Sequence, residues 1–114
     1  MTLTLNNISQ IYQVRGDYDT ALRYLENSLK IHQDIGDKSG EGTTLNNISQ
    51  IYNTQGDYDT ALCYLENSLK IHQDIGDKAG ECASLFNLAH IYQQNGNNQH
   101  ALNTWRKVYK IAKK

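Results

Sequence analysis

The sequence predicts an all-α fold, a solenoid of three helix-turn-helix units with about six antiparallel helices. Three observations lead to this prediction. The stretch LNNISQIY occurs at residues 5–12 and again at 45–52, apolar residues recur at helical spacing in each copy, and a Gly-Asp pair separates the helical stretches. One helix pair cannot bury both of its apolar sides, whereas pairs stacked along a line can.

A tandem duplication covers most of the 114 residues. Residues 5–40 and 45–80 agree at 31 of 36 positions. A third copy diverges, as expected for a terminal unit with a neighbour on one side only. We expect a single domain over 1–114, with units of approximately 1–37, 38–77 and 78–114. We also expect it to be a piece of a longer array, because the first unit lacks the residues DKxGE that open the other two. The differences between the first two copies are Gln13/Asn53, Val14/Thr54, Arg15/Gln55, Arg23/Cys63 and Ser39/Ala79.

The first helix of a unit has Leu5, Ile8, Ile11 and Tyr12 along one side. We expect it to end at Gly16, because glycine readily adopts the left-handed conformation that closes a helix. Asp17, Asp57 and their equivalents then cap the second helix by accepting backbone N–H bonds.

The second helix carries an amphipathic stripe of Tyr18, Ala21, Leu22, Leu25, Ser28 and Leu29, which Ile31 and Ile35 continue. Gly36 closes this helix, and Asp37 caps the next one. The two glycines in the following KSGEG weaken the opening turn of that next helix.

These positions resemble the tetratricopeptide repeat, in which a large apolar residue, Leu, a small residue, Tyr, Gly, an aromatic, Ala and a large apolar residue recur at the same offsets. The resemblance covers essentially the whole chain. The matching residues are Leu5, Ile8, Ser9, Tyr12, Gly16, Tyr18, Ala21 and Leu25; Leu45, Ile48, Ser49, Tyr52, Gly56, Tyr58, Ala61 and Leu65; and Leu85, Leu88, Ala89, Tyr92, Gly96, Asn98, Ala101 and Trp105.

The resemblance implies a right-handed α-solenoid and a non-enzymatic protein-interaction role. The units here are 40 residues long rather than the usual number of about 34. Longer units of this kind are similar to those of kinesin light chains, Pins-like scaffolds and bacterial multi-repeat proteins. HEAT and armadillo arrays share the 40-residue period and are the alternative fold, although the Gly-Asp corner argues against them.

The resemblance also implies that the first helices line a concave groove. The candidate peptide-binding residues are therefore the positions of those helices that packing does not use. None is Lys or Arg, so the groove does not resemble a carboxylate clamp. A carboxamide can donate and accept at once, as a peptide backbone requires; the alternative is that the repeated Asn only stabilises the helices. The candidates are Asn6, Asn7, Gln10 and Gln13; Asn46, Asn47, Gln50 and Asn53; and Phe86, Asn87, His90 and Gln93.

Composition excludes several other classes of function. The net charge of −1 gives no general attraction for nucleic acid or an anionic membrane. Cys63 and Cys82 occupy non-equivalent positions, which argues against a disulfide framework and favours the cytoplasm. His32 and His72 are not expected to converge on a metal. We expect no cofactor and no enzymatic activity.

The predicted function is a scaffold that binds an extended peptide or a partner helix in the groove. Two alternatives stay open: a self-associating structural or oligomerisation module, and a regulatory repeat domain of a larger signalling protein. Exposed solenoid ends or exchange of near-identical units would also permit a homodimer.

Overall fold

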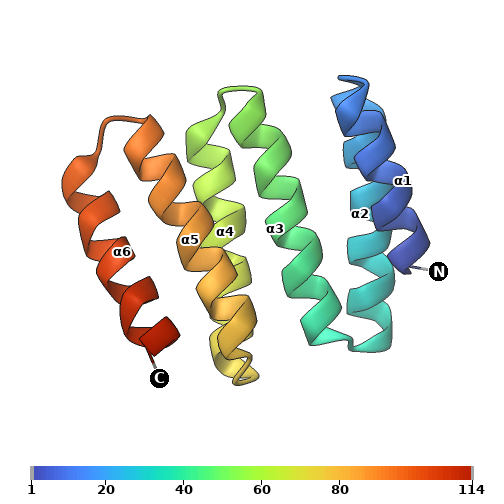
Figure 1. The fold of residues 1–114 in the computed structure, drawn as a ribbon. Helices are drawn as coiled ribbons and strands as arrows, with labels where there is room; N and C mark the ends of the chain where they lie inside the picture. Colours follow the sequence, from blue (N-terminus) through green and yellow to red (C-terminus); the bar gives the residue numbers. More distant parts are fainter. Residues whose placement is uncertain (1, 114) are drawn as a thin grey trace.

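The computed structural model describes residues 2–113 of the chain and the side chains of residues 8–111. This part contains six helices and no strand. The helices cross the molecule in chain order, and the two termini lie at opposite ends (Figure 1). The helices are α1 (Thr2–Val14), α2 (Tyr18–Ile35), α3 (Lys38–Thr54), α4 (Tyr58–Asp74), α5 (Lys78–Gln94) and α6 (Asn98–Lys113).

Each helix packs against its neighbours in the sequence, and α3 also contacts α5. The α1, α3 and α5 helices are the first helices of the three units, and α2, α4 and α6 are the second helices. The molecule measures 36 × 30 × 19 Å. The predicted all-α solenoid of helix-turn-helix units is confirmed.

The predicted helix boundaries follow from the Gly-Asp corners. Gly16 and Gly36 have φ of 81° and 73°, in the left-handed region. The carboxylate of Asp17 then accepts from the Thr20 backbone N–H at 3.3 Å, and that of Asp37 accepts from the Gly40 N–H at 3.0 Å. Both side chains therefore cap the helix that follows, as predicted.

Most of the buried apolar residues lie in two joints, each formed where a second helix packs against the first helix of the next unit. The first joint lies between α2 and α3 and the second between α4 and α5. All of these side chains are at most 6 % exposed. The first joint contains Ala21, Leu25, Ile48 and Ile51, and the second contains Ala61, Leu65, Leu85, Leu88 and Ile91.

Two packing predictions are wrong. Ile11 is 54 % exposed although its equivalents Ile51 and Ile91 are buried. Those equivalents are covered by the second helix of the preceding unit, and no helix of the described residues lies on that side of α1. Ile35 is 68 % exposed because it is the last residue of α2, where the chain reverses at Gly36.

The glycines at the start of α3 and α5 make room for buried histidines, a role we did not predict from the sequence. A Cβ on Gly40 would overlap the His32 ring, and a Cβ on Gly80 would overlap the His72 ring. His72 is also clamped from the other side, because a Cβ on Gly42 would lie 2.8 Å from its Nε2. These glycines are therefore required by close packing and are not simply weak points of the helix.

Polar contacts complete each junction between units. The Nδ1 atom of His32 lies 3.0 Å from the Asp37 carboxylate, and that of His72 lies 3.2 Å from the Asp77 carboxylate. The Gln33 amide donates to Glu41 at 3.4 Å, and Lys38 pairs with the same carboxylate at 3.3 Å. The equivalent contacts recur around Glu81. The side chains of the repeated IHQDIGDKxGE segment thus hold the end of one unit against the start of the next.

The cap at Asp37 predicts a dependence of stability on acid pH. The Gly40 backbone N–H, followed by the charge of His32, holds the pKa of Asp37 below its ordinary value of 3.8. A depressed pKa stabilises the fold fully above 3.8, and this contribution disappears as the pH falls through the folded-state pKa. We expect the difference in urea unfolding midpoint between the native chain and Asp37→Ala to shrink between about pH 5 and about pH 2. A difference that stays constant across this range would contradict the assignment.

Candidate functional site

The candidate groove residues divide into those whose side chains the structure describes and those it does not. The side chains of Asn6 and Asn7 lie outside the described residues. The other candidates come from the end of α1, from α3 and from α5, the three first helices of the units.

A pocket of about 200 Å³ lies between α3 and α5. It is lined by four of the candidates, two from each helix, together with Ser49, Ile91 and Gln94. First helices of adjacent units thus present four of the candidate side chains to one pocket. The four candidates are Gln50, Asn53, Asn87 and His90.

A second pocket of about 210 Å³ lies between the α1 end of the first unit and α3. Gln13 and Gln50 line it, together with residues near the corner that follows α1. Gln50 thus faces both pockets and links them into one amide-bearing surface. Gln10 is exposed on α1 but lines neither pocket, and the same is true of Gln93 on α5.

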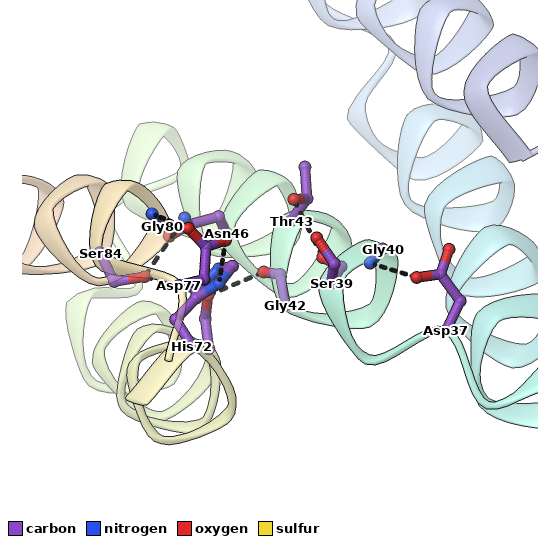
Figure 2. A network of polar contacts seen from close by, with 11 residues as sticks. Asp37, Ser39, Gly40, Gly42, Thr43, Asn46, His72, Asp77, Gly80 and Ser84 are labelled. Carbon is purple, nitrogen blue, oxygen red and sulfur yellow. Dashed lines mark hydrogen bonds and ion pairs between the residues drawn. The ribbon is translucent and has the colours of Figure 1, made fainter. Parts of the chain in front are cut away.

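Asn46 is engaged within the fold. It is 9 % exposed, its Nδ2 donates to Ser84 Oγ at 3.4 Å, and its Oδ1 accepts from Asn87 Nδ2 at 3.5 Å. Ser84 lies 3.1 Å from Ser68, which donates to the Gly42 carbonyl at 2.7 Å. Figure 2 shows part of this network of polar contacts between the start of α3 and the start of α5, which we call the seam. Asn47, the next residue, is half-buried and lines neither pocket.

Asn53 differs from the other amides of the surface. Its Oδ1 atom is buried and accepts no hydrogen bond, although the residue lines the pocket between α3 and α5. A buried acceptor without a donor costs about 1–3 kcal/mol. The pocket-lining residue Asn53 therefore carries one acceptor that is both unpaired and closed to solvent.

An aromatic cluster borders the same pocket, and the sequence predicts only part of it. The rings of Phe86 and His90 lie 4.6 Å apart between centroids, and both meet the ring of Trp105 on α6, at 5.1 Å and 5.3 Å respectively. All three contacts are edge-to-face, the arrangement that aromatic rings favour. The repeat pattern assigns Trp105 to packing only, so its place beside the candidate site is a new finding.

The described residues contain no group of three His, Cys, Asp or Glu that could hold a metal ion. His32 and His72 each contact an aspartate of their own junction, as described above. Cys63 and Cys82 are both free thiols. In the described part of the chain, no helix has the length and apolar character that crossing a membrane requires.

Stacked helix pairs, Gly-Asp corners and pockets between successive first helices are the features of a helical-repeat protein. The sequence profile of the tetratricopeptide repeat matches residues 1–74 and 55–114, which together span the chain. The chain belongs to the tetratricopeptide repeat family. HEAT and armadillo arrays, the alternative fold, are thereby set aside. No curated protein matches the sequence.

Solved structures agree on the fold. BtubC from P. vanneervenii superposes with a TM-score of 0.88 at 22 % identity, over 97 % of this chain and 46 % of that one. A putative kinesin light chain of Podosopora anserina with nearly identical TPR-like repeats gives 0.81 at 23 % identity, over 97 % of this chain and 55 % of that one. A single-substitution variant of the Podosopora anserina protein gives 0.82 at 22 % identity, over 97 % and 54 %. The chain spans about half the length of these structures.

Proposed function

We propose that this chain is a protein-interaction scaffold whose groove holds an extended peptide or a partner helix against α1, α3 and α5. Tetratricopeptide repeats in general mediate interactions between proteins. The observation that carries the finer proposal is the pocket between α3 and α5, where Gln50, Asn53, Asn87 and His90 converge. Four of the seven residues that line the pocket carry a side-chain amide and none is Lys, Arg, Asp or Glu, so an uncharged peptide backbone matches it better than a charged tail does.

The unused acceptor at Asn53 supports this proposal. The carboxamide oxygen of Asn53 is closed to solvent, so an incoming backbone N–H reaches it only after the side chain turns toward the pocket; pairing there would remove the cost of leaving the acceptor unpaired. Gln50, exposed on the same helix, can donate to the following peptide carbonyl. After that turn of the Asn53 side chain, Gln50 and Asn53 together offer a donor and an acceptor to a peptide main chain.

The test is the double variant Gln50→Ala with Asn53→Ala. A linear peptide selected from a displayed random library is titrated calorimetrically against the native chain and the variant. We expect about ten- to thirtyfold weaker binding, corresponding to the loss of two hydrogen bonds. We expect the stability of the free variant to be unchanged or slightly higher, because an unpaired acceptor is removed and Ala is a better helix former.

The matched control is Asn67→Ala, which removes an exposed amide from α4 outside the pocket. This variant should bind the peptide as the native chain does. Equal affinity of all three proteins, or a selection that enriches no peptide, would remove the groove from the function.

We propose self-association as a second function of the array. Its support is that apolar side chains are exposed at both ends, with Ile11 and Val14 on α1 and Phe86, Leu102 and Tyr109 on α5 and α6. Such surfaces favour association.

We also propose that the scaffold acts in the cytoplasm, where the free thiols of Cys63 and Cys82 stay reduced. It would be the regulatory repeat domain of a larger signalling protein and would have no catalytic activity of its own.

A further inference from the structure

We propose that this chain has a second binding site, for a carboxylate attached to a short alkyl group, in the pocket that residues of α4, α5 and α6 line beside Lys107 and Lys110. A short fatty acid and the C-terminal residue of a protein chain both carry this chemistry. The pocket is separate from the one between α3 and α5, and the proposal does not depend on peptide binding there.

The pocket has a volume of about 220 Å³ and receives one apolar side chain from each of three helices. Leu85 of α5 is only 3 % exposed, and Leu69 of α4 and Ile111 of α6 are half-buried. Pockets that take drug-sized ligands measure about 300–1,000 Å³. This smaller pocket therefore suits a single short alkyl group.

Two ammonium groups belong to the lining of the same pocket. Lys107 and Lys110 are exposed side chains of α6, and within the described residues neither makes an ion pair. A helix dipole favours cations in the last turn only. Because Lys107 lies more than one turn before the end of α6 at Lys113, the dipole does not account for it. The pocket thus combines apolar surface with unpaired positive charge.

The carboxylate in the lining is already paired. Glu81 lies 3.5 Å from Lys78 Nζ and accepts from Gln73 Nε2 at 3.3 Å. Since Lys78 offsets the charge of Glu81, the charges of the two α6 lysines remain available to an anion. Gln73 also lines the pocket, and among the described residues its Oε1 accepts no hydrogen bond. This oxygen is a candidate acceptor for a backbone N–H of the ligand.

The second unit shows that this charge is particular to the third unit and that a following unit leaves the site open. Asn67 and Lys70 stand where the third unit has Lys107 and Lys110, and Lys70 Nζ lies 3.9 Å from the Asp74 carboxylate. With α5 and α6 in place, the Lys70 side chain is still 77 % exposed and Asn67 is also exposed. By the same geometry, a unit adjoining α6 would not cover the proposed site.

The test is a titration of the isotope-labelled chain with four small probes, followed by the NMR shifts of its backbone amides. Hexanoate and N-acetylleucine carry both the carboxylate and the alkyl group, whereas acetate lacks the alkyl group and N-acetylleucinamide lacks the charge. We expect the first two to cause saturable shifts in α4, the start of α5 and α6, and the other two to bind at least about fivefold more weakly. Tighter binding of N-acetylleucine than of hexanoate would identify a protein C-terminus as the source, because only N-acetylleucine has an N–H for Gln73. Equal or tighter binding of hexanoate would identify a free fatty acid.

The double variant Lys107→Asn with Lys110→Gln removes both charges, and its first change introduces the residue that the second unit has at Asn67. It should bind hexanoate and N-acetylleucine about three- to twentyfold more weakly. Lys70→Gln, which removes an exposed lysine of α4 outside the pocket, is the matched control and should bind like the native chain. Circular dichroism checks the fold of both variants.

Three results would overturn the site: no saturable shift with hexanoate or N-acetylleucine, equally tight binding of acetate or N-acetylleucinamide, or undiminished binding by the double variant. Peptide binding in the groove should be unchanged in the double variant. Failure of either proposal can therefore be recognised separately from failure of the other.

Discussion

Replacing Leu65 by Ala is expected to lower the free energy of unfolding by about 2–5 kcal/mol, the largest effect of any single change considered. Leu65 is fully buried in the second joint, where it packs with Leu85, Leu88 and Ile91. Truncation removes buried methyl groups and leaves a cavity between α4 and α5. Urea unfolding followed by circular dichroism measures the loss.

The solenoid geometry adds a second expectation for this variant. Because each unit contacts only its neighbours, weakening the second joint should loosen α5 and α6 more than α1 and α2. Amide hydrogen exchange should therefore accelerate most in the third unit. Leu102→Ala, at an exposed leucine of α6, is the control and should cost no more than about 0.5 kcal/mol. A similar loss in both variants would show that the joint does not dominate stability.

Gly40→Ala is expected to destabilise the chain by about 1–3 kcal/mol. Helix propensity alone predicts the opposite sign, because Ala in a helix is favoured over Gly by about 0.5–1 kcal/mol. The added Cβ would overlap the His32 ring and approach the Asp37 carboxylate, so packing outweighs propensity. The midpoint of urea unfolding reports the sign directly.

Two further variants test whether the loss of stability in Gly40→Ala comes from contact with His32. Ser39→Ala, one residue earlier and exposed, introduces the residue already present at Ala79 and should be neutral. In the double variant His32→Ala with Gly40→Ala, the overlap is gone, so the second change should cost less than it does alone. Additive losses would mean that the clash is not the cause.

The helices and their ends could be predicted from sequence because the signals are local. A Gly in the left-handed conformation followed by a capping Asp needs only a few consecutive residues, and the apolar spacing defines the buried side of each helix. Because the chain is a repeat, the same local signals occur in more than one unit and support one another. Predictions that required knowledge of a neighbour were less secure, as Ile11 shows: the residue matches Ile51 in sequence but not in surroundings.

The candidate site was predicted as a surface, but its details depend on how helices of adjacent units cross. Asn46 and Asn47 are consecutive, and only the relative twist of α3 and α5 decides that Asn46 enters the seam with Ser84 and Asn87. The seam also differs between the joints. Ser28 and Thr44, equivalent to Ser68 and Ser84, are buried without partners, whereas Ser68 and Ser84 are bonded.

The packing of His32 on Gly40 could have been found from the sequence. Both residues recur one unit later, as His72 and Gly80, and a glycine retained in the first turn of two helices calls for a packing reason. Trp105 gave no such signal, because its contact with Phe86 and His90 joins two helices through side chains that have no equivalent in the other units.

The near-identity of the first two units bears on how such a gene can change. Four of the five differences between the first two copies, at positions 14/54, 15/55, 23/63 and 39/79, lie at residues exposed in both. Recombination that inserted or removed one 40-residue unit would therefore recreate the same interface on each side of the crossover. The number of units in the array can therefore change without requiring a new interface between units. Selection can then alter how many copies of the groove amides a ligand meets, with little effect on the stability of the fold.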